Sequence, residues 1–135
     1  MKKLILAILC LAVALTVAAC TAEKLSTEKL RDIDFTVVKE EDIPKEFAAE
    51  ISKKQNVPFK LTYADQGMLY IAEGYGAQAT SGYSIEVSEC YETSNAIYVR
   101  TDLIGPSKEE EVVETATYPY IVIKLEFLDK HVVFQ

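Results

Sequence analysis

Histidine, tryptophan and cysteine are scarce in this sequence: it has one histidine, no tryptophan and three cysteines among 135 residues. With His131 as its single histidine, the chain cannot supply the two-histidine helix of a zinc enzyme, and no two cysteines have CxxC spacing. A Cys90 and His131 pair could act as nucleophile and base, but nothing around either residue favours this. We therefore expect a protein that is not an enzyme and that holds no metal or cofactor.

Basic side chains are also few. The chain has 14 lysines and arginines against 21 aspartates and glutamates, a formal charge of −7. Such a surface repels phosphate groups, which argues against nucleic acid as a partner. The acidic run at 109–111 lacks the Asp/Asn alternation and central glycine of a calcium loop. The glycines of 74–82 lack the GK[ST] sequence of a phosphate-binding loop.

The N-terminus has the pattern of a secretory signal: Lys2 and Lys3, then an apolar run over 4–17 that is too short for a membrane span. The run ends in Val17-Ala18-Ala19-Cys20, which resembles the lipobox of bacterial lipoprotein precursors. The resemblance implies cleavage before Cys20 and covalent attachment of diacylglycerol and an N-acyl chain, such as palmitate, to that cysteine. The domain would then be held on the extracytoplasmic side of a bacterial cell membrane or outer membrane.

These features divide the chain into a signal peptide at 1–19, a lipidated tether at 20–32 and one domain at 33–135. Loss of Lys2 and Lys3 with the signal would change the formal charge from −7 to −9. The acyl chains, rather than a basic patch, must therefore hold the protein on the bilayer. Cys90 would be left without a disulfide partner, and we expect a buried small hydrophobe rather than an exposed thiol.

The polar tether shows a weak helical pattern around 28–31, and ordered structure is expected from Phe35, with a short strand over 35–38. Pro44 suits the first turn of a helix. Apolar residues then recur every four positions at Ile43, Phe47 and Ile51, which predicts one amphipathic helix.

From Pro58 onward the hydrophobic period changes to two, which indicates strands. A hairpin is expected over 59–72 around the turn Asp65-Gln66-Gly67. Further strands are expected over 83–87, 97–101, 120–127 and 131–134, with a bulge near 88–91 and an acidic, irregular loop over 105–116. Because the turns are too short for parallel crossovers, we expect an antiparallel arrangement.

The predicted fold class is therefore α+β: one N-terminal helix packed on a mostly antiparallel β-sheet or a small β-sandwich of about six to seven short strands. Glu86 and Glu89 are expected on opposite faces of their strand, because residues three apart in a regular strand point in opposite directions. The eight tyrosines mostly fall at strand positions, where they suit core and cross-strand packing.

Two stretches resemble the C-terminal domain of the PrcB family of protease-complex subunits. They are Thr80-Ser81-Gly82-Tyr83-Ser84-Ile85-Glu86-Val87 and Thr115-Ala116-Thr117-Tyr118-Pro119-Tyr120-Ile121-Val122-Ile123, with Pro106 between them. The resemblance runs from about Leu61 to Phe127, and Ser81 stands where the family usually has a second glycine. It implies a small, non-catalytic, often lipid-anchored domain, in a family named after an accessory subunit of a subtilisin-like surface protease.

The motif residues also have physical roles of their own. Gly82 permits an unusual backbone conformation or a close approach, and Pro119 suits the first position or the edge of a strand. We take Gly82, Tyr83, Tyr118, Pro119 and Tyr120 as candidate binding residues.

The sequence thus favours a membrane-anchored surface lipoprotein that acts as a non-catalytic, protein-binding accessory subunit, with an envelope protease as one partner. The alternative is a solute- or glycan-binding lipoprotein that uses a tyrosine-lined face. A cleft shared by Tyr75, Tyr83 and Tyr118 would favour that alternative.

Overall fold

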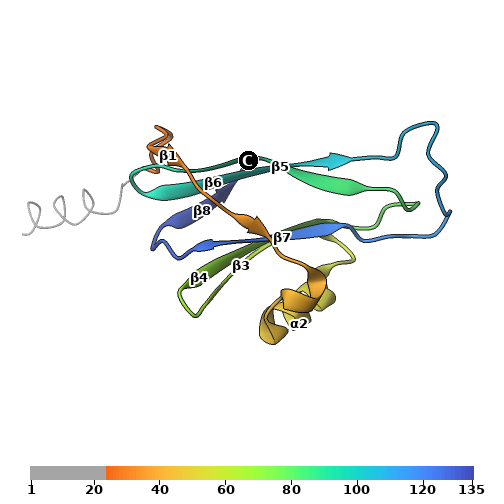
Figure 1. Ribbon diagram of the computed structural model, residues 1–135, viewed down its shortest axis with the longest axis horizontal. Coiled ribbons are helices and arrows are strands. Elements are labelled where there is room, and N and C mark those ends of the chain that lie inside the picture. Colours follow the sequence, from red (N-terminus) through yellow and green to blue (C-terminus); the bar gives the residue numbers. More distant parts are fainter. Residues whose placement is uncertain (1–23) are drawn as a thin grey trace, which may run out of the picture.

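A computed structural model describes residues 24–135 as three layers: two four-stranded sheets and one helix (Figure 1). The upper sheet, sheet A, has the strand order β1-β5-β6-β8, and the lower sheet, sheet B, has the order β2-β7-β4-β3. The strands are β1 (Arg31–Asp32), β2 (Thr36–Val37), β3 (Pro58–Asp65), β4 (Met68–Tyr75), β5 (Ser84–Glu92), β6 (Ala96–Ile104), β7 (Tyr120–Glu126) and β8 (His131–Phe134). The expected α+β sandwich is confirmed in outline, but the described residues form eight strands, not six or seven.

The predicted helix is present as α2 (Lys45–Lys54), preceded by the short 3-10 helix η1 (Glu40–Asp42). Pro44 occupies the N-cap position, and Glu46 lies in the first turn, where the helix dipole favours an acid. Phe47 and Ile51 are buried against the outer face of sheet B, as their spacing predicts. Figure 1 shows α2 beneath that sheet.

The hairpin β3–β4 is also confirmed. Its two turn residues, Gln66 and Gly67, both have positive φ, of 49° and 75°. A two-residue turn of this kind matches the twist of the flanking strands, so the ladder runs from Pro58↔Tyr75 to Asp65↔Met68 without interruption. β5 and β6 form the second hairpin, and the expected bulge lies between Val87 and Glu89.

The expectation of an antiparallel arrangement is wrong for one pair, because β6 and β8 are parallel. The reason is that β7 lies between them in the chain but belongs to the other sheet. The chain leaves β6, returns along sheet B as β7 and re-enters sheet A as β8 in the direction of β6. Alternation between the two sheets therefore makes a parallel pair without a long helical crossover.

The helix expected around 28–31 is also wrong. Residues 24–38 form an extended N-terminal strap, which pairs with β5 through β1 and with β7 through β2. Structure begins before Phe35, since Asn95 Nδ2 donates to the carbonyl of Lys24 at 3.0 Å and its Oδ1 accepts from the Ser26 amide at 2.8 Å. The strap therefore starts at the β5–β6 turn, crosses the side of the sandwich and ends in sheet B. Figure 1 shows this path.

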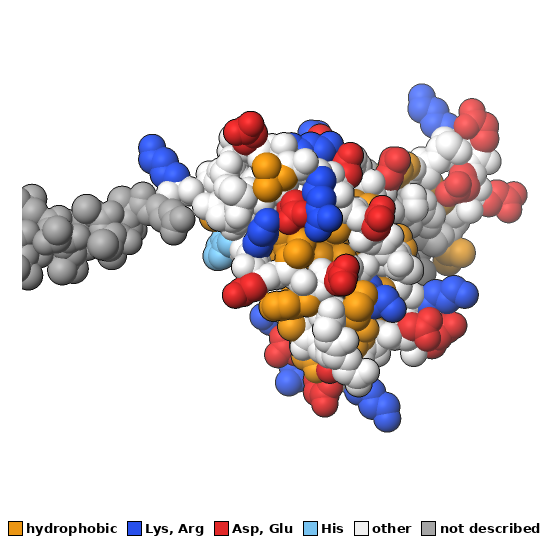
Figure 2. Space-filling view, turned by 60° about the vertical axis from the view of Figure 1, so that its left-hand side comes forward, with side chains coloured by type: hydrophobic (Ala, Val, Ile, Leu, Met, Phe, Trp, Pro, Cys, Tyr) orange, Lys and Arg blue, Asp and Glu red, His pale blue; other side chains and the backbone are white. Residues whose placement is uncertain are grey.

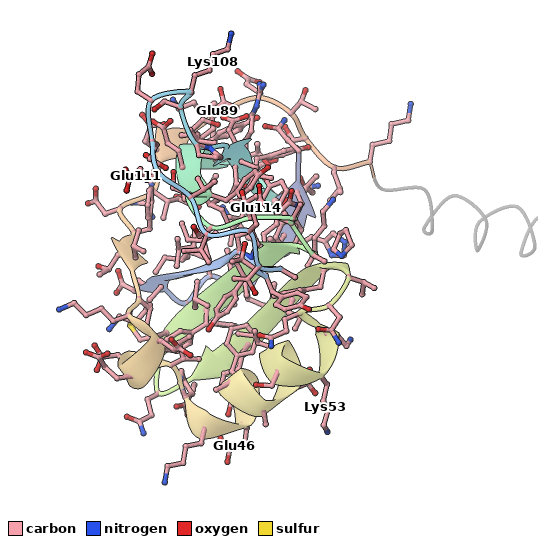
Figure 3. All side chains as sticks on the ribbon, turned by 90° about the vertical axis from the view of Figure 1, so that its right-hand side faces the viewer. Glu46, Lys53, Glu89, Lys108, Glu111 and Glu114 are labelled. Carbon is pink, nitrogen blue, oxygen red and sulfur yellow. The ribbon has the colours of Figure 1, made fainter. Side chains whose placement is uncertain are left out.

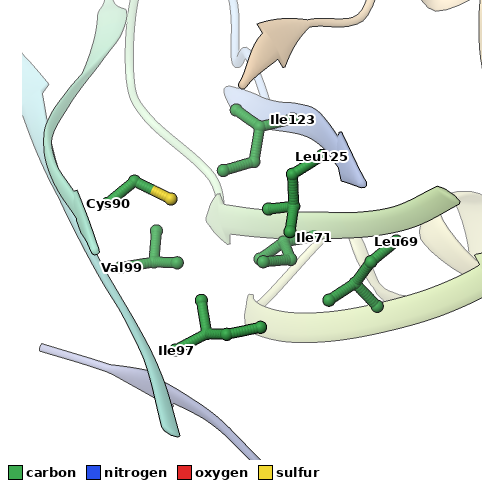
Figure 4. Close-up of a cluster of buried hydrophobic side chains, with 7 residues drawn as sticks. All are labelled: Leu69, Ile71, Cys90, Ile97, Val99, Ile123 and Leu125. Atoms are coloured by element: carbon green, nitrogen blue, oxygen red, sulfur yellow. The ribbon is translucent and has the colours of Figure 1, made fainter. Parts of the chain in front are cut away.

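The main core lies between the sheets, and Figure 4 shows its buried side chains. They are Leu69, Ile71, Cys90, Ile97, Val99, Ile123 and Leu125. Each large aliphatic side chain that is fully buried contributes about 1.5–3 kcal/mol. Cys90 is 5% exposed, as its expected role as a buried small hydrophobe requires. Among residues 24–135, no helix is long and apolar enough to cross a membrane.

Candidate functional site

Two long connections lie side by side at the end of the sandwich farthest from Lys24. These distal loops are residues 76–83, which join β4 to β5, and residues 105–119, which join β6 to β7 (Figure 1). Gln78 and Thr117 exchange backbone hydrogen bonds of 2.8 and 3.0 Å. The Ser81 amide donates to the Val113 carbonyl at 3.0 Å, and the Val113 amide donates to Ser81 Oγ at 2.8 Å. Each loop is therefore held to the other at two separate points along its length.

Gly82 lies where the two distal loops are closest to each other. Its φ of 92° lies in the region that residues with a side chain rarely adopt. A Cβ atom at this position would lie 2.9 Å from Cβ of Pro106 and 2.6 Å from Oε2 of Glu110. The backbone of the first distal loop at Gly82 therefore lies directly against side chains of the second distal loop. The predicted close approach at Gly82 is confirmed. Tyr83 follows and places its ring beside Gly105.

The second motif forms a different surface. Tyr118, Pro119 and Tyr120 line a groove of about 300 Å³ between β7 and the strap, with Val37, Val38, Glu40, Ile43, Ile121 and Val122 as its other walls. The Pro119 carbonyl accepts from the Tyr75 amide at 3.1 Å and so extends the β4–β7 pairing toward the loops. The Tyr120 ring packs on Phe59 with centroids 6.3 Å apart. The five motif residues are therefore divided between the loop framework and the groove.

Among the described residues, no pocket joins Tyr75, Tyr83 and Tyr118. Tyr75 directs its hydroxyl to Thr101, Tyr83 packs on Gly105, and Tyr118 lines the groove. The cleft that would have favoured glycan binding is absent from this part of the chain.

Sequence reasoning missed a buried carboxylate between the sheets. Glu73 is 8% exposed and is surrounded by aliphatic side chains: Ile71, Val87, Val99, Ile121 and Ile123. Thr101 Oγ1 donates to Glu73 Oε2 at 2.9 Å and is itself 2.5 Å from the Tyr75 hydroxyl. Since threonine has one hydroxyl proton, Tyr75 must donate to Thr101. Burial raises the pKa of Glu73, although the Thr101 bond opposes the shift. The signal was available: Leu69, Ile71, Glu73 and Tyr75 alternate on one face of their strand.

The raised pKa of Glu73 gives a prediction with a defined sign. A carboxyl whose pKa is higher in the folded state destabilises the fold when ionised, and the penalty disappears as pH falls through that raised pKa. We expect Glu73→Gln to stabilise the domain at pH 7 by about 0.5–2 kcal/mol. The gain should shrink as the pH falls toward the ordinary carboxyl range. Urea unfolding at several pH values measures this.

The matched control for Glu73→Gln is Glu86→Gln, which removes one carboxylate from the exposed face of β5. Its unfolding free energy should change little at any pH. A Glu73→Gln variant that is less stable at pH 7, or whose effect does not depend on pH, would contradict the assignment.

A second buried carboxylate, Glu92, fixes the strap at the other end of the sandwich. Lys130 Nζ donates to Glu92 Oε2 at 2.7 Å and to the Thr93 carbonyl at 2.8 Å, and Arg31 Nε pairs with Glu92 Oε1. The hydrogen bond from Lys130 is the main reason why the pKa of Glu92 is lowered. Because Arg31 belongs to β1, this cluster joins the strap to the β7–β8 turn.

The bulge in β5 changes the position of Glu89. The register shifts between Val87 and Glu89, so Glu86 faces Asp102 and Glu89 faces Arg100. Glu86 and Glu89 are both exposed and share the outer face of sheet A, which corrects the expectation of opposite faces. Figure 3, viewed from the distal end, shows Glu89 on this outer layer and Glu111 and Glu114 on the distal loop.

Cys90 and His131 do not form a site. Cys90 lies in the core, where burial raises its thiol pKa to about 11, and His131 is exposed at the start of β8, paired with Ala96. Within residues 24–135, no group of histidine, cysteine and acidic side chains is arranged to hold a metal ion. The signal and lipobox residues, Val17, Ala18, Ala19 and Cys20, lie outside the described residues.

The comparisons with known proteins identify one family. Residues 69–126 match the model of the family described as PrcB C-terminal. The matched segment begins in β4 and ends with β7, so it contains both distal loops and all five motif residues. No significant match was found among curated proteins or among solved structures.

Proposed function

Residues 69–126 match the PrcB C-terminal family, and on that premise we propose that this chain is a lipid-anchored, non-catalytic accessory subunit that docks onto another envelope protein. A protease is the partner class that the family name suggests. The observation that carries the proposal is the framework of the two distal loops, which lies within the family segment.

The distal loops offer a surface that is fixed before any partner arrives. Hydrogen bonds of 2.7–3.0 Å between polar atoms hold them together, including one from Thr117 Oγ1 to the Thr80 carbonyl. A surface that is already ordered loses less conformational entropy on binding, which favours a docking role.

The strap supports an orientation in which this surface faces away from the membrane. Lys24 lies at the β5–β6 turn. Cys20 is four residues before it in the chain, and four residues of extended backbone reach at most about 14 Å. The nine residues of β6 then carry the fold about 30 Å from that turn to the distal loops. A lipid on Cys20 would therefore keep the β5–β6 turn near the bilayer and present the distal loops outward.

The membrane anchor would raise the encounter rate with a partner in the same membrane, because both proteins are confined to one surface. The face in Figure 2 carries acidic and basic side chains in mixture, with apolar side chains between them. No single-sign patch dominates this view. With a net charge of −7, attachment through acyl chains is simpler than attachment through basic side chains.

The test is crosslinking in intact producing cells with the tagged full chain, followed by capture and mass spectrometry. We expect one envelope protein to be enriched by the native chain, and enrichment to fall at least severalfold for Cys20→Ala. Thr27→Ala, an exposed strap position, is the matched control that leaves the lipobox intact. A chain that carries no acyl group at Cys20, or that captures no protein reproducibly, would refute the proposed function.

A further inference from the structure

The outer edge of β7 is only partly covered. β2 pairs with Ile123 and Lys124 alone, and the Val38 amide donates to the Val122 carbonyl at 2.8 Å. Beyond Val38 the strap turns away into η1. The first residues of β7 therefore have β4 on one side and no strand on the other.

On its free side, the start of β7 has backbone groups without a strand partner. In an antiparallel ladder, alternate residues direct their N–H and C=O groups to opposite neighbours. Pro119 bonds toward β4 and Val122 bonds toward the strap, so Tyr118 and Tyr120 direct theirs toward the open edge. No loop or turn hydrogen bond among the described residues involves the backbone of Tyr118 or Tyr120. An edge in this state can accept an additional strand.

The groove of about 300 Å³ runs beside this same edge. Its apolar wall includes Val37 and Tyr118, which are 56% and 38% exposed. A strand added to β7 would place every second side chain on the groove side of the sheet. The groove therefore suits small apolar side chains at alternate positions.

One acidic side chain, Glu40, lines the groove. Glu40 stands at the groove and, after burial, is the second cause of the raised pKa of Tyr120. Glu41 and Asp42 follow Glu40 in η1, and Lys39 directly precedes it. The segment 39–42 therefore carries three negative charges and one positive charge. None of the ion pairs among residues 24–135 uses these three acids. Complementary charge on an incoming strand would be lysine or arginine.

We propose that the open edge of β7 binds an extended segment of the partner protein as an added β-strand, with small apolar side chains in the groove and a basic side chain opposite Glu40. The existence of a partner rests on the proposed function, but the site and its ligand chemistry rest on the edge, the groove and Glu40. A second copy of this chain fits poorly, because Glu40 and the neighbouring acids of η1 would then face the same acids of the other copy.

The edge strand at the opposite side of sheet B, β3, has features that oppose pairing. It begins with Pro58, which has no N–H to donate, and it carries Lys60 exposed in the strand. Natural sheets use proline and lysine in this way to block addition of a strand. The β7 edge has tyrosines at the corresponding free positions.

The direct test is an NMR titration of residues 20–135, lipidated or carrying Cys20→Ser, with a short peptide that alternates valine and lysine. We expect the largest amide shifts at Tyr118, Tyr120 and Val37. A valine–glutamate peptide of equal length, and a valine–lysine peptide N-methylated on its pairing side, should leave these amides unchanged. Glu40→Lys should weaken binding about fivefold, as expected for loss of one exposed charge pair and gain of a repulsion.

Glu50→Lys is the matched control. It makes the same charge change on the exposed face of α2 and should bind as the native protein does. Shifts spread over the whole acidic surface, equal weakening in both variants, or dimerisation through this edge would each overturn the proposal. If the Glu40→Lys variant still captures the partner in cells, the β7 edge is not the binding site, but the accessory function stands. If peptide mapping succeeds but no partner is captured, the accessory function fails and the edge remains a strand-binding site.

Discussion

Phe47→Ala is expected to destabilise the domain by about 3–5 kcal/mol, the usual cost of removing a fully buried aromatic side chain. Phe47 is 1% exposed, and its ring stacks on Tyr63 with centroids 5.3 Å apart and lies 6.4 Å from the ring of Tyr70. Alanine would leave a cavity between α2 and sheet B that rigid strands cannot close. Because domains of this size are stable by about 5–15 kcal/mol, the loss should be plain in urea unfolding.

The helix lies outside the segment that matches the family, so this variant also tests whether α2 is part of the folding unit. Glu50→Ala, on the exposed face of the same helix, is the control and should change stability by less than about 0.5 kcal/mol. A loss below about 1 kcal/mol for Phe47→Ala would mean that α2 does not pack on the sheet. Loss of helix signal in a separate, earlier transition would mean that α2 folds independently.

Local signals in the sequence predicted local structure well. The four-residue spacing of Ile43, Phe47 and Ile51 located the helix, and Asp65-Gln66-Gly67 located the hairpin turn. These features depend on residues close in the chain, so sequence alone specifies them.

Features that depend on distant pairing were not visible in the sequence. The parallel pairing of β6 with β8 follows from the position of β7 in the other sheet, which no local pattern encodes. β1 is two polar residues long and exists only because β5 offers an edge. The weak helical pattern around 28–31 did not become a helix, because pairing with β5 outweighs a local propensity there.

The candidate site shows the same division. The unusual backbone at Gly82 was predictable, because glycine at the start of a strand indicates a conformation or approach that other residues cannot adopt. That Pro106 would be its neighbour, and that Tyr118 and Tyr120 would line a separate groove, required the fold. The lipobox residues remain a prediction, as they lie outside the described residues.

Gly82→Ala is expected to cost about 2–4 kcal/mol, the sum of an unfavourable left-handed backbone and overpacking against Pro106. Its φ is 92°, and the new methyl group would lie 2.9 Å from Cβ of Pro106. The side chain of Glu110 can move aside, since it is exposed. The Pro106 ring cannot, because it is bonded to its own backbone nitrogen. Gly67→Ala is the matched control, because Gly67 also has positive φ, of 75°, and a methyl group added there would have no neighbour within 4 Å.

Both glycine variants place alanine at a positive φ, of 92° and 75°, so the difference between their unfolding free energies mainly reports the packing of the distal loops. We expect Gly82→Ala to lose about 1–3 kcal/mol more than Gly67→Ala. Amide exchange at Ser81 and Val113, whose hydrogen bonds join the loops beside Gly82, should accelerate only in the Gly82 variant. An equal loss of unfolding free energy in the two variants would show that the distal loops are not in close contact at Gly82. If the distal loops are the docking surface, only Gly82→Ala should also reduce partner capture, because only that change separates the loops.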